Sequence, residues 1–129
     1  MFAPKPKPAP GPATITKPDA TAGQFLRNAL SRAGIPARRD GDSGSSYIAI
    51  RVGAHGIIMI TGVSGRAKEN EIDYRPREHQ GWGAVYYPNT RDDDGRFTDF
   101  YRSTNADLAR DTALVVNAVQ DLIGRRSTS

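Results

Sequence analysis

Residues 46–65, with the sequence SYIAIRVGAHGIIMITGVSG, contain the pattern that decides the fold of this chain. In residues 47–52, isoleucine and valine side chains alternate with other residue types, which is typical of a strand with one buried face. Residues 57–60 are an unbroken apolar run, which favours a strand covered on both faces. The Gly-Ala-His-Gly sequence between the two runs is typical of a tight turn. The stretch therefore predicts an antiparallel hairpin with strands over residues 47–52 and 56–63.

A helix is predicted on the amino-terminal side of this hairpin, over residues 22–33. Thr21 and Gln24 have the spacing of a capping box, in which the two side chains satisfy amide groups of the first helical turn. Apolar residues then recur at intervals of three and four. Gly34 suits the left-handed position that ends a helix, and Pro36 prevents its continuation.

A second helix is predicted near the carboxyl end, with Thr104 as its N-cap and Gly124 as its end. Its apolar stripe follows helical spacing and consists of Leu108, Thr112, Val115, Val119 and Leu122. A stripe of this width is expected to cover one face of the sheet as the main lid of the core.

Two further strands are predicted between the hairpin and the second helix, over residues 81–87 and 96–101. Residues 37–45 and 63–80 are polar, and we expect loops there, the longer one being mobile unless it folds onto a ligand. The expected fold class is α+β: one domain with a helix, a three- to four-stranded antiparallel meander and a second helix. Both helices are expected on one face of the sheet, which leaves the other face open.

Residues 1–20 are predicted to be a disordered arm, separate from a single domain over residues 21–129. Six of the nine prolines lie in this arm, among three lysines, and such a composition favours extended, solvated chain. The arm carries a net charge of +2, and so does the remainder, with fifteen Lys or Arg against thirteen Asp or Glu. The domain is therefore nearly balanced in charge.

Composition limits the classes of function. The chain has no cysteine, which excludes disulfides and thiolate chemistry. It shows no secretory signal pattern and no apolar run of membrane-spanning length, so a soluble, cytoplasmic protein is expected. His55 and His79 are the two histidines. His55 lies in the predicted tight turn, where we expect it to be exposed, and His79 has no nucleophile at a recognisable spacing. The acidic run 92–94 does not match a calcium loop. No enzymatic activity, catalytic residue, metal or cofactor is expected.

The order of helix, three strands and helix resembles that of the double-stranded-RNA-binding domain. That family carries a lysine cluster at the start of its second helix, where this chain has Asn105-Ala106-Asp107-Leu108-Ala109-Arg110-Asp111. The resemblance is therefore limited to the order of the elements, and it implies no role in RNA binding.

The open sheet face is the predicted functional surface, because both helices cover the other face while residues 57–60 supply apolar side chains to both. We expect a small accessory or regulatory protein that binds a protein partner or a second copy of itself through this face and the 63–80 loop. The expected partner-binding residues are Tyr47, Arg51, Ile57, Met59, Trp82 and Tyr86. The alternative is nucleic-acid binding by arginines, a lysine and aromatic rings. Its basic residues would be Arg66, Lys68, Arg75, Arg77, Arg96 and Arg102.

Overall fold

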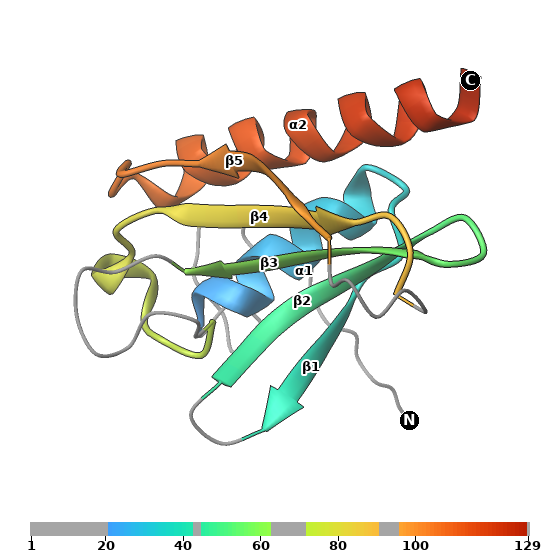
Figure 1. Cartoon of the computed structure of the whole chain (residues 1–129). Helices are drawn as coiled ribbons and strands as arrows, with labels where there is room; N and C mark the ends of the chain where they lie inside the picture. Colours follow the sequence, from blue (N-terminus) through green and yellow to red (C-terminus); the bar gives the residue numbers. More distant parts are fainter. Residues whose placement is uncertain (1–20, 43–44, 63–71, 91–95, 129) are drawn as a thin grey trace, which may run out of the picture.

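The computed structural model describes residues 21–42, 45–62, 72–90 and 96–128, and shows two helices packed on a five-stranded sheet (Figure 1). In chain order the elements are α1 (Ala22–Arg32), β1 (Arg38–Asp42), β2 (Ser45–Val52), β3 (Gly56–Gly62), η2 (Pro76–Glu78), β4 (Trp82–Tyr87), β5 (Thr98–Arg102) and α2 (Leu108–Thr128). The proposed arm and the acidic run 92–94 lie outside the described residues.

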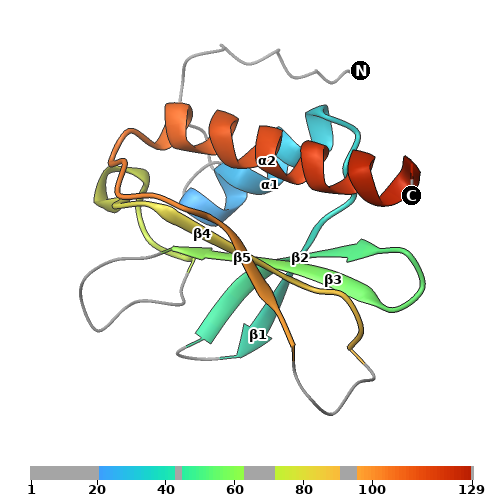
Figure 2. The same ribbon diagram turned by 45° about the horizontal axis from the view of Figure 1, so that its top comes forward.

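The sheet is an antiparallel meander in the order β1-β2-β3-β4-β5. Both helices lie on the same face of it, α1 over β1 and β2 and α2 over β4 and β5 (Figure 2). The α+β class, the central hairpin, the two later strands and the one-sided placement of the helices are confirmed. The strand count is higher than expected, because β1 is an additional strand.

The hydrophobic core lies between the sheet and the helices. On the sheet side it is formed by the isoleucines that point toward the helices, which are all between 0 and 2% exposed: Ile48, Ile50, Ile58 and Ile60. These residues face one another across β2 and β3 in register. The helices contribute Leu26 and Leu30 from α1 and Val115 and Val119 from α2, each 0% exposed. The two apolar stripes seen in the sequence therefore meet the sheet as expected.

Helix α1 begins and ends by the signals that predicted it. The Oγ1 atom of Thr21 accepts a hydrogen bond of 3.1 Å from the backbone N–H of Gln24. After the helix, Gly34 has a φ of +80°, in the left-handed region. The backbone N–H of Ile35 donates to the carbonyl oxygen of Leu30, and the Ile35 side chain joins the core. This combination of glycine, backward hydrogen bond and apolar contact closes the helix end.

Strand β1 corrects the expectation of a loop over residues 37–45. Its sequence is Arg-Arg-Asp-Gly-Asp, with no apolar residue to show an alternating pattern. It pairs in register with β2, from Arg38 opposite Ala49 to Asp42 opposite Ser45. Because β1 is the edge strand, its side chains need not be buried on both faces, and charged residues are common at such edges.

Helix α2 differs from the prediction at both ends. Its N-cap is Asp107 rather than Thr104, because the Oδ1 atom of Asp107 accepts from the backbone N–H of Arg110 at 3.2 Å. The helix passes Gly124 and continues to Thr128. Glycine ends a helix when it adopts a left-handed conformation, and Gly124 instead keeps a helical one. Within the described part of the chain, no helix combines the length and apolarity that a membrane crossing requires.

Residues 72–80 are not a mobile loop, as the polar sequence suggested, but pack against the domain. The first amide groups of α1 donate to this segment, Ala22 to the carbonyl of Tyr74 and Gly23 to that of Ile72, both at 2.8 Å. The Ile72 side chain is 1% exposed. A side chain on Gly23 would come within 3 Å of that isoleucine, so glycine permits this close approach. The remainder of the expected loop, 63–71, lies outside the described residues.

Candidate functional site

Three rows of side chains cross the open face of the sheet, which is the face opposite the helices. Each row runs from strand to strand through residues that are paired or that continue the register of the neighbouring pairs. The first row consists of Arg51, Ile57, Tyr87 and Phe97. The second row consists of Arg38, Ala49, Met59, Val85 and Asp99. The third row consists of Asp40, Tyr47, Thr61, Gly83 and Arg102.

Phe97 joins the first row just outside β5. Because the adjacent residues Tyr86 and Thr98 are paired, Phe97 lies opposite Tyr87. The centres of these two rings are 5.5 Å apart. Asp99 pairs with Val85 and Tyr101 pairs with Ala84, so Phe100, which lies between them on β5, forms a bulge. The bulge directs Phe100 and Tyr101 toward the core, and Asp99 to the open face.

The centre of the open face is apolar and is not covered by either helix. Five of its side chains are partly exposed, in contrast to the buried isoleucines of the helix-covered face: Tyr47, Ile57, Met59, Val85 and Tyr87. Phe97 is 54% exposed. Apolar side chains grouped in this way on a surface commonly mark an interaction site.

Charged residues stand at the ends of two rows. The second row begins with Arg38 and ends with Asp99, and the third begins with Asp40 and ends with Arg102. Within β1, a guanidinium nitrogen of Arg38 lies 3.3 Å from a carboxylate oxygen of Asp40. The pKa of Asp40 is below its ordinary value, first because the Gly41 backbone N–H donates to it and then because of Arg38. The open face thus has an apolar centre, with one acidic and one basic residue on β1 and another acidic and basic residue on β5.

A hollow of about 350 Å³ lies on the β1 side of this face. It is lined by Pro36, Ala37, Arg38, Ala49 and Arg51. The floor is formed by small apolar residues and the rim by the two arginines. Such a hollow fits an apolar group that carries an acidic or aromatic neighbour.

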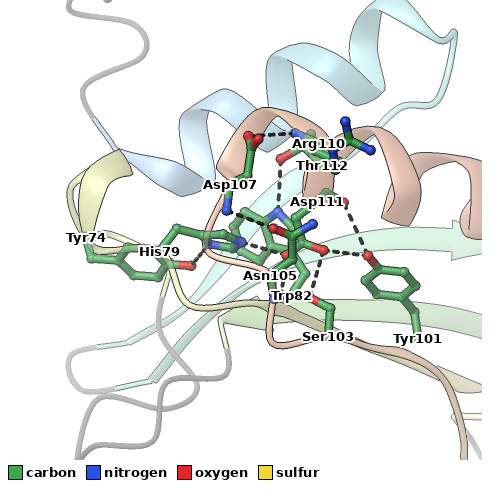
Figure 3. A network of polar contacts seen from close by, with 10 residues as sticks. All are labelled: Tyr74, His79, Trp82, Tyr101, Ser103, Asn105, Asp107, Arg110, Asp111 and Thr112. Carbon is green, nitrogen blue, oxygen red and sulfur yellow. Dashed lines mark hydrogen bonds and ion pairs between the residues drawn. The ribbon is translucent and has the colours of Figure 1, made fainter.

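A second cluster of polar groups lies on the helix-covered side, around the carboxylate of Asp111 in the first turn of α2 (Figure 3). Its Oδ2 atom accepts from Nε2 of His79 at 2.7 Å and from the backbone N–H of Trp82 at 2.8 Å. Its Oδ1 atom accepts from the Tyr101 hydroxyl at 2.5 Å and the Ser103 hydroxyl at 2.7 Å. Four donors therefore fill the acceptor positions of one carboxylate.

The hydrogen-bond chain from Tyr74 through His79 to Asp111 has the connectivity of a nucleophile, a base and an orienting carboxylate. The Tyr74 hydroxyl lies 2.7 Å from Nδ1 of His79, so it donates there while Nε2–H donates to Asp111. However, burial, and to a lesser extent the charge of Asp111, raises the pKa of Tyr74, which opposes its use as a nucleophile. His79 is 1% exposed. These features favour a structural role, in which α2, β4 and the 72–80 segment are tied together.

The protonation states in this cluster follow from its hydrogen bonds. Burial by itself raises the pKa of Asp111, but donors from His79, Tyr101 and Ser103 outweigh it and keep the pKa below its ordinary value. Burial and then the bond to Asp111 raise the pKa of Tyr101 to about 12. The carboxylate is therefore the ionised member, and the tyrosines remain donors.

The structure places four of the six expected partner-binding residues on the open face: Tyr47, Arg51, Ile57 and Met59. Placing Trp82 and Tyr86 there was wrong. Both point to the helices, Trp82 being 0% and Tyr86 8% exposed. The predicted strand was correct, but its residues alternate in the opposite phase, because the large aromatic side chains fill the space under α2.

The basic residues of the nucleic-acid alternative are not gathered in one place. Arg66 and Lys68 lie outside the described residues. Arg75 and Arg77 are exposed at η2, whereas Arg96 and Arg102 are exposed at β5. Only Arg102 of these four belongs to the rows of the open face. Within the described ranges, no three His, Asp or Glu side chains are grouped as metal ligands would be.

Sequence reasoning placed His55 correctly in an exposed turn, but it missed the role of His79 and Asp111. A signal for Asp111 was present in the spacing. It lies three residues after Leu108 and beside Thr112, inside the buried stripe of α2, where an acid requires partners. Residues 38, 40, 99 and 102, at the ends of the rows, were not identified as a set, because their alignment depends on register across five strands.

No protein-family model, curated protein or solved structure matches the chain.

Proposed function

We propose that this protein is a small, non-catalytic accessory protein that acts by binding a protein partner through the open face of its sheet. The observation that carries the proposal is the difference between the two faces. The isoleucines of the helix-covered face are at most 2% exposed, whereas the apolar centre of the open face is partly exposed along all three of its middle strands. Covering such a surface is favourable by roughly 25 cal/mol for each Å² of apolar area removed from water.

A protein suits this face better than a nucleic acid because of its charges. The rows contain Arg38, Arg51 and Arg102 but also Asp40 and Asp99, and each acid stands in line with an arginine of its own or a neighbouring row. A phosphate backbone would be repelled by both carboxylates. Binding to nucleic acid through the exposed arginines is the alternative outcome that the experiment below distinguishes.

The test is site-specific photo-cross-linking in the cells that make the protein. A benzophenone amino acid replaces Met59, in the middle of the open face, and in a control it replaces Leu114, which is 46% exposed on α2. We expect a cross-linked protein, identified by mass spectrometry, from position 59 but not from position 114. The same product should disappear when Val85→Glu is added beside position 59.

Three results would contradict the proposal. One is a product of equal yield from both positions. Another is a product at position 59 that nuclease treatment removes, which would support the nucleic-acid alternative. The third is the absence of any product at position 59, which would show that the face remains in contact with water.

A further inference from the structure

We infer that the partner of the open face is a second copy of this chain, stacked face to face about a two-fold axis that runs along β3. This inference rests on the proposed function and adds the identity of the partner. It is carried by the order of charges and shapes along the three rows.

A two-fold axis parallel to β3 exchanges the sides of the sheet but keeps each row opposite itself. The β1 end of a row in one protomer then faces the β5 end of the same row in the other. In the second row, Arg38 faces Asp99 of the second copy, and in the third row Asp40 faces Arg102 of the second copy. Both contacts occur twice by symmetry, so the charges at the ends of the second and third rows all meet their opposites.

The first row is complementary in shape rather than in charge. On its β1 side lies the hollow lined by Pro36, Ala49 and Arg51, and on its β5 side lies Phe97, which is 54% exposed. The same rotation brings Phe97 of each copy over the hollow of the other. A cavity of about 150 Å³ can hold a benzene ring, so a hollow of about 350 Å³ has room for this side chain.

The residues of the first row on β2 and β4 add a stacking contact. Arg51, on β2, faces Tyr87 of the second copy, on β4, and a guanidinium over an aromatic face is a favourable pair. At the centre, Met59 meets Met59, and an unbranched thioether adapts well to such a self-contact. The apolar middle of the face is thereby removed from water.

Stacking about an axis across the strands is unfavourable. Such an axis would keep each strand opposite itself, so Arg38 would face Arg38 and Asp99 would face Asp99. Like charges placed opposite each other in an interface cost several kcal/mol. Of these two axes, the charges therefore favour the one along β3.

The size of the face suffices for a specific pair. Three rows, which span up to five strands spaced about 4.8 Å apart, give a planar footprint on the order of 500 Å² in each copy. The pair would bury about 1,000 Å² or more, which is the lower limit of specific interfaces. We expect dissociation in the micromolar range.

The test uses charge reversal in the full-length chain, followed by sedimentation velocity at concentrations from about 1 μM to about 1 mM. The variants Arg38→Asp and Asp99→Arg should each be monomeric where the unaltered chain is a dimer, because each places like charges opposite each other twice. Mixed together, the two variants should form a one-to-one dimer, because both contacts then join opposite charges. A matched control, Asp121→Arg on the exposed side of α2, should leave the dimer unchanged.

Phe97→Ser gives a second, independent test, with Leu114→Ser as its control. We expect at least a tenfold weaker association for Phe97→Ser and no change for Leu114→Ser. A monomeric unaltered chain at about 1 mM would overturn the inference, as would two charge variants that stay monomeric when mixed. Those results would leave the proposed function standing if position 59 still cross-links to a different protein.

Discussion

Replacing Asp111 by leucine should remove a large part of the stability of this fold. The carboxylate accepts four hydrogen bonds, and two of their donors cannot change role. The backbone N–H of Trp82 is fixed by its strand and would keep only its longer hydrogen bond, of 3.3 Å, to the Ser103 hydroxyl oxygen. The imidazole of His79 is fixed between Tyr74 and Asp111. The hydroxyls of the other two donors can rotate toward other acceptors.

The expected magnitude follows from the two fixed donors. Each buried polar group left without a partner costs about 1–3 kcal/mol. His79 would lose its acceptor altogether and Trp82 would keep only the longer bond to Ser103, so Asp111→Leu should lower the free energy of unfolding by about 3 kcal/mol. In a domain of this size, each kcal/mol corresponds to roughly 4 °C in the melting temperature, or about 12 °C altogether. Asp111→Asn should cost only about 1 kcal/mol, since its oxygen can still serve both fixed donors.

Urea denaturation is the assay, followed by the fluorescence of Trp82, the one tryptophan of the chain. Trp82 lies within the cluster, its ring 4.7 Å from that of His79, so its emission reports on this region. Asp107→Asn on the same helix is the control and should be nearly neutral, because asparagine is also a good N-cap. A loss below about 1 kcal/mol for Asp111→Leu would refute the assignment of a structural role to the cluster.

The pH dependence of Asp111→Asn provides a further check with a definite sign. The pKa of Asp111 in the folded state lies below the ordinary value of 3.8. The ionised carboxylate therefore stabilises the fold fully above that ordinary value, and this contribution is lost as the pH falls through the lower, folded-state pKa. The difference in unfolding free energy between the unaltered chain and Asp111→Asn should thus be largest near about pH 6 and should shrink toward about pH 2. A difference that grows in acid would contradict the assignment.

The remaining predictions concern three other positions. Gly34→Val should lower the free energy of unfolding by about 1 kcal/mol or more, because Gly34 has a φ of +80°, and an unchanged denaturation curve would argue against this helix end. Gly23→Ala should be destabilising by about 2 kcal/mol, since the added carbon would meet Ile72, and calorimetry should show the loss. Thr112→Val should cost about 1–3 kcal/mol by removing the acceptor for Nε1 of Trp82, 3.0 Å away, whereas Thr112→Ser should retain most of the stability.

Much of the fold could be predicted because its signals are local. The hairpin of β2 and β3 is visible in a few adjacent residues, and the end of α1 is encoded by Gly34 and Ile35. Strand β1 could not be recognised in this way, because its charged sequence acquires extended structure only by pairing with β2. The same reason explains why the face of Trp82 was assigned wrongly. Its strand pattern was clear, but the phase depends on which face α2 covers.

The candidate site was less predictable than the fold because it depends on register. Tyr47 and Met59 could be assigned to the open face from alternation alone. The pairing of Arg38 with the row of Asp99 spans all five strands, and no short stretch of sequence records it. The cluster around Asp111 likewise depends on distant residues, since His79 and Asp111 are 32 positions apart in the chain.

The charges of β1 also bear on the aggregation of this protein. An outermost strand exposes backbone groups to which a strand of another molecule can add, and repeated addition leads to fibres. In β1, residues 38–40 are all charged, and Arg39 forms an ion pair with Asp73 across the side of the sheet. An incoming strand would have to displace or desolvate these groups before its backbone could pair. The charged edge strand thus disfavours aggregation, and replacing residues 38–40 by valines should increase the tendency of the protein to precipitate.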